Sequence, residues 1–241
     1  MIVLRTLSRL INTYTVTAVI DTALCIGAGG SSGSLADKPI VRNPEGNLLI
    51  PGSQIKGRLR HECEKIARGL GWEISESPSP GKMVIRRDNA PNNFRRREYE
   101  VSGYNETYHC LISQIFGDPV LPSRVMFDDL ICTEDAENLA EFIRPGVTIN
   151  RRRRTAEENK LYLLETSPPH VSLRFEGQIH LLPDFPSYAK PLILAGFKHI
   201  HALGGSKSAG LGWLSWENLP KFEGTQADWD FLAKGGENAA N

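Results

Sequence analysis

The feature that most restricts the fold is an amphipathic segment at residues 53–70, which follows an extended stretch and a glycine-rich loop. Its apolar side chains recur at steps of three and four residues, at Ile55, Leu59, Cys63, Ile66 and Leu70. That spacing puts them on one stripe of an α-helix, which has to be buried against another layer of the protein. Ser53 is a suitable N-cap, and Gly69 and Gly71 are suitable helix terminators.

Strand patterns surround this helix. Residues 11–24 alternate, with Tyr14, Val16, Ala18 and Ile20 on one face, which predicts a strand with one face on a core. Further strands are expected over residues 123–135, 160–166, 170–181 and 211–218, and a second helix over 186–205. The order of strand, helix, strand, hairpin, helix and strand predicts an α+β, ferredoxin-like (RRM-like) fold with an antiparallel sheet and helices on one face.

Composition limits the functional classes. Basic and acidic residues balance at 28 each over 241 residues, so any nucleic-acid contact must use local basic patches. A net charge near zero also suits a subunit of an assembly. The cysteines show no pairing pattern, residues 1–16 alternate too much for a secretory signal, and no apolar run approaches the ~20 residues that span a bilayer. We therefore expect a cytoplasmic protein without membrane contact.

The loop and helix start suggest a site for a phosphate polymer. Glycines such as Gly29 and Gly30 let backbone amides approach a phosphate chain, and Asp37 lies at the end of the loop. The helix start supplies the candidate RNA contacts Ser53, Lys56, Arg58 and Arg60, where a bound anion would offset cations placed against the helix dipole. The alternatives are a solvated helix face and, for Asp37, a turn residue.

Two further tracts are candidate RNA contacts. A run of four arginines, Arg151, Arg152, Arg153 and Arg154, falls at the tip of an expected hairpin, where it could grip phosphates or could be a solvated turn. A glycine-rich tract between the second helix and the last strand contains Gly205, Lys207, Ser208 and Gly210. It lacks the context of a P-loop, so it is either a helix-to-strand turn or a backbone contact for phosphate.

Residues 72–110 look like an insertion. Their polar, arginine-rich stretch contains Arg86, Arg87, Arg95, Arg96 and Arg97, and can be interpreted as a solvated flap or as a nucleic-acid contact. His61, Cys63, His109 and Cys110 are possible zinc ligands, but neither pair has the spacing of a zinc motif, so we do not expect a structural zinc site.

Three ordered motifs carry a resemblance to a known family. They are residues 36–60 (ADKPIVRNPEGN through IPGSQIKGRLR), residues 114–119 (QIFGDP) and residues 203–213 (LGGSKSAGLGW). Together they resemble the RAMP superfamily of CRISPR-associated proteins, and more narrowly the backbone subunit of type III effector complexes of the Csm or Cmr kind, type III-D included. The resemblance runs from Thr13 to Trp216 and leaves out the insertion and the tail.

The resemblance implies a modified ferredoxin-like palm with a thumb hairpin at about 146–170, which here would carry the four arginines. It implies a single domain over 1–220, with the insertion at about 72–110 and a polar, loosely ordered tail at 221–241. Such subunits stack along a guide crRNA beside other effector subunits, and the thumb interrupts the duplex between guide and target RNA. In members that cut, a loop aspartate, here Asp37, promotes cleavage of target RNA that depends on Mg²⁺ or Mn²⁺.

The chemistry of RNA agrees with that role, because the 2′-hydroxyl is a built-in nucleophile that a carboxylate or a bound divalent ion can assist. Two alternatives stay open. The chain could be a non-cleaving scaffold of the same complex, with Asp37 merely structural. It could also be an endonuclease that processes crRNA with His199 or His201 as the general acid or base.

Overall fold

The computed structural model describes residues 12–27, 36–135, 137, 139–140, 142–222 and 224–235. Its main sheet is antiparallel, with the order β10-β1-β9-β6-β2, and β5 pairs with β9 beyond that path. The strands are β1 (Asn12–Ile20), β2 (Leu49–Ile50), β5 (Val125–Phe127), β6 (Leu130–Cys132), β9 (Leu173–Leu181) and β10 (Leu214–Asn218). Two helices, α2 (Gly52–Gly69) and α5 (Ala189–Lys198), connect β1 to β6 and β9 to β10.

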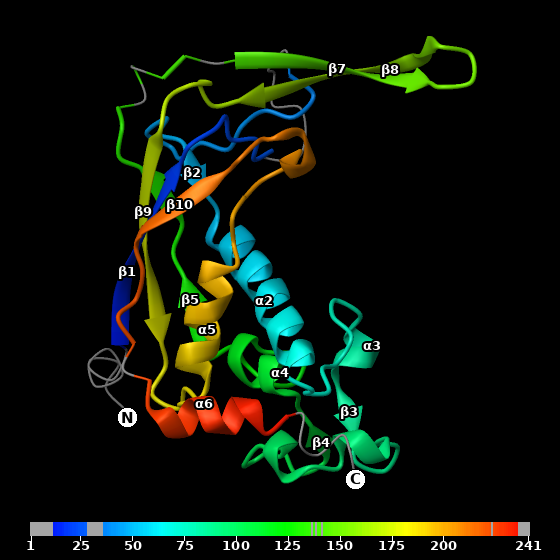
Figure 1. Cartoon of the computed structure of the whole chain (residues 1–241), viewed down its shortest axis with the longest axis vertical. Coiled ribbons are helices and arrows are strands. Elements are labelled where there is room, and N and C mark those ends of the chain that lie inside the picture. Colours follow the sequence, from blue (N-terminus) through cyan, green and yellow to red (C-terminus); the bar gives the residue numbers. More distant parts are fainter. Residues whose placement is uncertain are drawn as a thin grey trace.

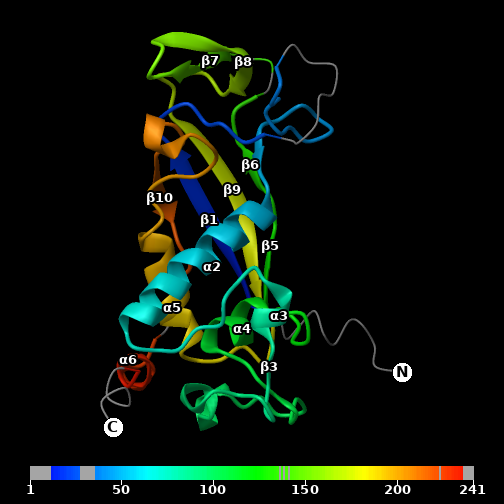
Figure 2. The same ribbon diagram turned by 90° about the vertical axis from the view of Figure 1, so that its right-hand side faces the viewer.

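This topology confirms the predicted ferredoxin-like fold, because the four strands β1, β6, β9 and β10 lie in the spatial order β10-β1-β9-β6. Both helices cover the same face of the sheet (Figures 1 and 2). The alternation of the first strand is also confirmed, since Val16, Ala18 and Ile20 are fully buried. The apolar stripe of α2 packs in the same core, where Leu59 and Cys63 have no exposed surface.

The start of α2 differs from the prediction. The helix begins at Gly52 after Pro51, and Ser53 is exposed in the first turn without capping any amide, so the prediction of Ser53 as N-cap is wrong. A carboxylate from the turn between β5 and β6 caps the helix instead, because Asp129 Oδ1 accepts the Gly52 N–H at 2.7 Å. Gly52 leaves no room for a side chain, since a Cβ there would lie 2.4 Å from the carbonyl oxygen of Phe127.

A second, two-stranded sheet forms the predicted hairpin. Strands β7 (Phe142–Asn150) and β8 (Thr155–Thr166) pair from Phe142↔Thr166 to Asn150↔Thr155, so the ladder begins a few residues earlier than expected. The four arginines occupy the turn at the tip, where Asn150 Oδ1 accepts the amides of Arg152 and Arg153 at 3.1 Å. The hairpin projects from one end of the palm (Figure 1).

The insertion is folded and lies at the other end (Figure 2). It contains α3 (Pro80–Met83), β3 (Ile85–Arg86), the short 3-10 helices η1 (Asn92–Phe94) and η2 (Arg97–Tyr99), and β4 (Thr107–Tyr108), and it leads into α4 (Leu111–Phe116). Trp72 and Tyr99 bury an edge-on ring contact there, with centroids 6.1 Å apart. Aromatic burial of this kind joins the insertion to the hydrophobic core of the palm.

The prediction of a loosely ordered tail is wrong for residues 224–235. They contain α6 (Gln226–Ala233), which starts with a capping box between Thr225 and Asp228. Its Leu232 is buried and its backbone carbonyl accepts the indole N–H of Trp72 at 2.8 Å. The tail therefore packs on the insertion. No helix in the described ranges is both long and apolar enough to cross a membrane.

Two glycines in α2 test the close approach of helix and sheet. We expect Gly52→Ala to lower the free energy of unfolding by about 1–3 kcal/mol, because the added methyl group overlaps the Phe127 carbonyl. Gly57→Ala is the matched control, since a Cβ there meets nothing within 4 Å and alanine gains about 1 kcal/mol of helix propensity. Urea unfolding of the three proteins checks this, and equal stabilities for the two variants would contradict it.

Candidate nucleic-acid interface

The loop after β1 places Asp37 at the foot of the β7–β8 hairpin. Asp37 is exposed, and its backbone N–H donates to the Leu163 carbonyl at 3.0 Å. In return, the carboxylate oxygen Oδ2 accepts the Leu163 N–H at 2.7 Å. One side chain thus completes a two-way pairing between the loop and β8. The sequence left two roles open for Asp37, as a catalytic residue or as a structural turn residue. This hydrogen bond gives the aspartate a structural role as an acceptor.

The pairing continues for several residues along β8. Lys38 and Leu164 form a parallel bridge, and the Lys38 carbonyl accepts the Glu165 N–H at 3.2 Å. Glu165 is buried, and its Oε2 accepts the Ile40 N–H at 3.1 Å. The base of the hairpin is therefore held in a fixed position relative to the Asp37 carboxylate.

Two cations near this foot were not singled out from the sequence. Burial raises the pKa of the Cys25 thiol, and the charges of Lys38 and Arg144 partly offset the increase. Lys38 directly follows Asp37, while Arg144 lies on β7 opposite Leu164. The adjacency of Lys38 was visible in the sequence. The position of Arg144 depends on the register of the hairpin, and the sequence did not show it.

The glycine-rich tract packs against the segment around Cys25. Two of its glycines are required because a side chain would not fit. A Cβ at Gly212 would lie 1.8 Å from the Leu203 carbonyl, and one at Gly204 would lie 2.5 Å from the Cys25 carbonyl. Gly205 donates its amide to the Cys25 carbonyl at 2.7 Å, and Gly210 donates to Lys207 at 3.0 Å. Phosphate contacts by these two amides would compete with those bonds. They remain predictions, as do contacts by Lys207 and Ser208 in the 3-10 turn η4 (Lys207–Ala209).

The basic start of α2 divides into two faces. Lys56 and Arg60 share one face, as predicted, and line a groove of about 460 Å³ against α3 and residues 116–123. Arg58 lies on another face and pairs with the buried Glu62 at 2.9 Å. Burial lowers the pKa of Lys56, and the neighbouring Arg60 lowers it further.

Several charges of this helix are satisfied within the protein. Arg60 bonds Glu64 at 3.1 Å and donates to the Gly117 carbonyl at 2.8 Å. Asp129 supplies an anion at the helix N-terminus, where the sequence suggested a phosphate. RNA binding by Ser53, Lys56, Arg58 and Arg60 therefore stays a prediction. Lys56 lines the groove and, unlike Arg58 and Arg60, forms no ion pair within the described part of the chain.

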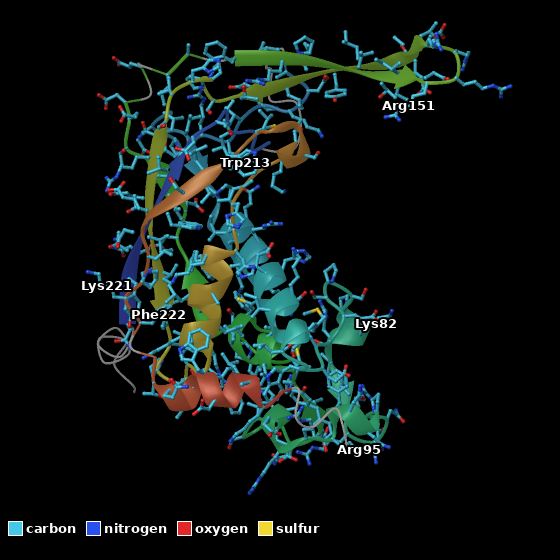
Figure 3. All side chains as sticks on the ribbon, viewed as in Figure 1. Lys82, Arg95, Arg151, Trp213, Lys221 and Phe222 are labelled. Carbon is cyan, nitrogen blue, oxygen red and sulfur yellow. The ribbon has the colours of Figure 1, made fainter. Side chains whose placement is uncertain are left out.

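The arginines at the hairpin tip are exposed cations. Residues 151–154 are all exposed, and none of the four forms an ion pair with the rest of the described chain. Figure 3 shows Arg151 near the end of the hairpin, away from the palm. Gly29 and Gly30 lie outside the described residues.

The possible zinc ligands are spread over different surroundings. Cys63 lies in the core, and its thiol donates to the Leu192 carbonyl at 3.6 Å. Cys110 caps α4, while His61 is exposed on α2. Over the described ranges, no three His, Cys, Asp or Glu side chains converge to hold a metal ion. His199 and His201, the candidates for guide processing, are exposed after α5.

A buried polar network joins the insertion to α4. His109 Nδ1 lies 2.6 Å from Asp118 Oδ2, and both side chains are fully buried. Asp118 Oδ1 also accepts the amides of Val120 and Leu121. Burial alone would raise the pKa of Asp118, but the hydrogen bonds from His109 and from the two amides outweigh it and lower the pKa. Asp118 is therefore an ionised acceptor on both oxygens.

With a ferredoxin-like palm, a projecting basic hairpin and a carboxylate at its foot, the chain falls in the RRM-like class of α+β folds. A family model of the RAMP superfamily matches residues 17–215, and the chain belongs to this superfamily. No curated protein matches it.

A chain in the cryo-EM structure of the Type III-B Cmr-beta bound to cognate target RNA shares this fold, with a TM-score of 0.56 at 16% sequence identity. The similarity covers 90% of this chain and 62% of that chain.

The lowered pKa of Asp118 predicts a pH dependence. A carboxyl group whose pKa is lower in the folded state stabilises the fold above its ordinary pKa of about 3.9, and this stabilisation is lost as pH falls below it. We expect Asp118→Asn to cost about 2 kcal/mol at pH 7, since an amide cannot accept on both sides, and to lose less stability than wild type on acidification.

Urea unfolding at pH 7 and at pH 3.5 checks this. Glu45→Gln, in an exposed turn, is the control and should behave as wild type at both pH values. An Asp118→Asn protein as stable as wild type at pH 7 would show that the network carries no such energy.

Proposed function

We propose that this chain is the backbone subunit of a type III CRISPR effector complex, which binds guide crRNA and complementary target RNA and cleaves the target through Asp37. The observation that carries the proposal is the exposed Asp37 carboxylate, held by the Leu163 amide at the foot of an arginine-tipped hairpin. Membership of the RAMP superfamily and the fold shared with a chain of a Cmr complex bound to target RNA support it.

The hairpin suits an RNA duplex for two reasons. Its tip carries four exposed arginines, which attract phosphates. Its two strands also expose apolar side chains, with Ile149 61% and Leu161 67% exposed, and such side chains can wedge between bases. A hairpin inserted between base pairs would splay the target strand close to its foot, where Asp37 lies.

Splaying matters because cleavage needs the 2′-oxygen in line with the adjacent phosphorus. In the proposed step, the 2′-oxygen attacks phosphorus and the 5′-oxygen leaves, which gives a 2′,3′-cyclic phosphate and a 5′-hydroxyl end. Asp37 takes the proton of the 2′-hydroxyl, and water returns a proton to the leaving oxygen. Lys38, beside Asp37, would offset the charge that develops on the phosphate.

The residues at the foot of the hairpin could supply one carboxylate ligand to a divalent ion. Asp37 offers a single carboxylate, with Oδ2 already bonded to Leu163, so Oδ1 would either bind the ion or accept the 2′-hydroxyl proton. Magnesium commonly keeps several waters and binds through one or two carboxylates together with substrate phosphates. A bound Mg²⁺ or Mn²⁺ would stabilise the negative charge of the phosphate as it is attacked.

A non-cleaving scaffold is the second candidate, and one observation favours it. The hydrogen bond from Leu163 to Asp37 gives the aspartate a structural purpose that requires no catalysis. Under this hypothesis, the residue fixes the hairpin so that it meets the guide–target duplex at the right angle, and another subunit cuts the RNA.

Two substitutions at Asp37 separate the candidates. Asp37→Asn keeps an oxygen to accept the Leu163 amide but removes the charge, whereas Asp37→Ala removes both. If Asp37 is catalytic, both variants should cut labelled target RNA at least about 10²-fold more slowly in magnesium, while target affinity in Asp37→Asn stays near wild type. The assay uses the assembled complex with guide RNA.

Either of two results would decide against cleavage by Asp37. Unchanged cuts with Asp37→Asn would make this chain a scaffold, and so would cuts that disappear only together with target binding. A target with a single 2′-deoxy nucleotide at the cleavage position is the chemical control, because it should be bound but not cut there.

The arginines of the tip predict a salt effect. We expect the double substitution Arg152→Gln/Arg153→Gln to weaken binding of the guide–target duplex and to reduce the slope of log K against log salt by about 1.5, since two phosphate contacts are lost. Lys198→Gln/Lys221→Gln removes two exposed cations elsewhere and should leave the slope unchanged. Filter binding at several salt concentrations checks this, and equal slopes for the two doubles would contradict phosphate contact at the tip.

A further inference from the structure

The insertion contains a cavity that the proposed function does not use. Its volume is about 920 Å³, within the range of pockets that hold small ligands. Arg86, Arg87, Tyr104, Thr107, Asp88 and Glu106 are among the residues that line it. It lies in the arginine-rich stretch whose sequence left a solvated flap and a nucleic-acid contact as equal alternatives.

The β3–β4 pair turns one face to the core and the other to this cavity. Ile85 lies opposite Tyr108, which is buried, while Arg86 lies opposite Thr107. Directly opposed residues of an antiparallel pair project on the same side, with Cβ atoms about 5 Å apart. Arg86 and Thr107 therefore form one polar wall of the cavity, backed by the apolar contacts of Ile85 and Tyr108.

The structure separates the five arginines of the insertion by what they contact. Arg95 donates to the Ala90 carbonyl at 2.9 Å, and Arg96 lies over the Trp72 ring at 4.4 Å. Arg87 lies over Tyr108 and pairs with Glu100. Arg86 and Arg97 are exposed and form no ion pair with other described residues. Of these two, only Arg86 lines the cavity.

One donor at the cavity wall lacks a partner. The Nε atom of Arg87 is buried and has no hydrogen-bond partner within the described part of the chain. A buried donor left unsatisfied costs free energy, but solvent does not reach this atom, so a ligand in the cavity does not contact it.

Thr107 presents an oriented hydroxyl on the same wall. Its Oγ1 lies 2.8 Å from His109 Nε2, and the other ring nitrogen, Nδ1, faces the ionised Asp118. In the neutral imidazole, Nδ1–H donates to Asp118 and Nε2 accepts the hydroxyl proton of Thr107. The alternative acceptor for that proton, the Tyr104 carbonyl, is farther away at 3.4 Å. In that tautomer the Thr107 oxygen is left as an acceptor, which suits a ribose 2′-hydroxyl.

An aromatic ring completes the wall. Tyr104 is partly exposed and is held edge-on against His109, with centroids 5.7 Å apart. A ring held in place in this way loses little freedom when a base stacks on it. The carboxylates of Asp88 and Glu106 would repel a run of phosphates but can accept the amino groups of guanine, adenine or cytosine.

We propose that this cavity binds a nucleotide of single-stranded RNA, with its phosphate on Arg86, its base on Tyr104 and its 2′-hydroxyl on Thr107. The inference rests on the proposed RNA-binding function but concerns a separate site, at the opposite end of the palm from the hairpin (Figure 1). The insertion would then guide a flanking, unpaired stretch of guide or target RNA past the palm.

Photo-crosslinking tests this with the full chain and an unstructured RNA that carries 6-thioguanosine. We expect a crosslink in the tryptic peptide that contains Tyr104, at a yield that falls about tenfold in Arg86→Glu and in Tyr104→Leu. Arg97→Glu is the matched control, because it removes an exposed arginine of the insertion outside the cavity, and it should keep the yield. DNA of the same sequence should crosslink at this peptide several-fold less than RNA, since it lacks the 2′-hydroxyl. Thr107→Val should remove that preference.

The outcomes distinguish the two proposals. Crosslinks confined to the hairpin and palm would overturn the cavity proposal and leave the proposed function standing. A chain that crosslinks to RNA nowhere would overturn both. An equal loss of yield in Arg97→Glu and Arg86→Glu would show that bulk charge, and not the cavity, holds the RNA. Circular dichroism of each variant confirms that the insertion is folded.

Discussion

The pairing between the loop after β1 and strand β8 is the interaction on which the rest of the proposed interface depends. A β-hairpin of two strands has little stability alone, and among the described residues β7–β8 makes no ladder with the main sheet. Its position is set where Asp37 and Lys38 exchange backbone bonds with Leu163 and Glu165. Because the Asp37 carboxylate is part of this exchange, the same residue that is proposed to act on RNA also determines where the hairpin brings the RNA.

Much of the fold could be predicted because its signals are periodic. The alternation of β1 and the apolar stripe of α2 depend on burial alone, and both appear where expected. The start of α2 could not be predicted, because its cap comes from Asp129, a residue far along the chain, while Ser53 was the better local candidate. The tail was missed for a similar reason. It has few apolar residues, but Phe231 stacks between Trp72 of the insertion and Tyr188, which precedes α5, and these partners come together only in the folded chain.

The sequence predicted which residue types form the candidate site better than it predicted which of them are free to bind RNA. Glycines 204, 205, 210 and 212 suggested a phosphate cradle, yet the space around Gly204 and Gly212 is filled by carbonyl groups of the protein itself. Likewise, Arg58 and Arg60 suggested free cations, but each has a glutamate one turn further along α2. A sequence shows which groups are present, and the partners that occupy them follow from the tertiary structure. The arginines at the hairpin tip stay exposed because the end of a hairpin has few neighbouring residues to pair with them.

The same reasoning turns the insertion from an uncertain stretch into a specific surface. Its arginines look equivalent in the sequence, but aromatic stacking and ion pairs fix Arg87 and Arg96 in structural positions. Arg86 differs because its strand pairs it with Thr107, on the face away from the core. The His109 ring, held by the buried Asp118, lies within hydrogen-bond distance of the Thr107 hydroxyl. Asp118 lies in the loop after α4, and α4 packs on α2, so the polar network behind the cavity wall is attached to the palm through α4. A strand of RNA held at this cavity would therefore meet a surface fixed to the palm.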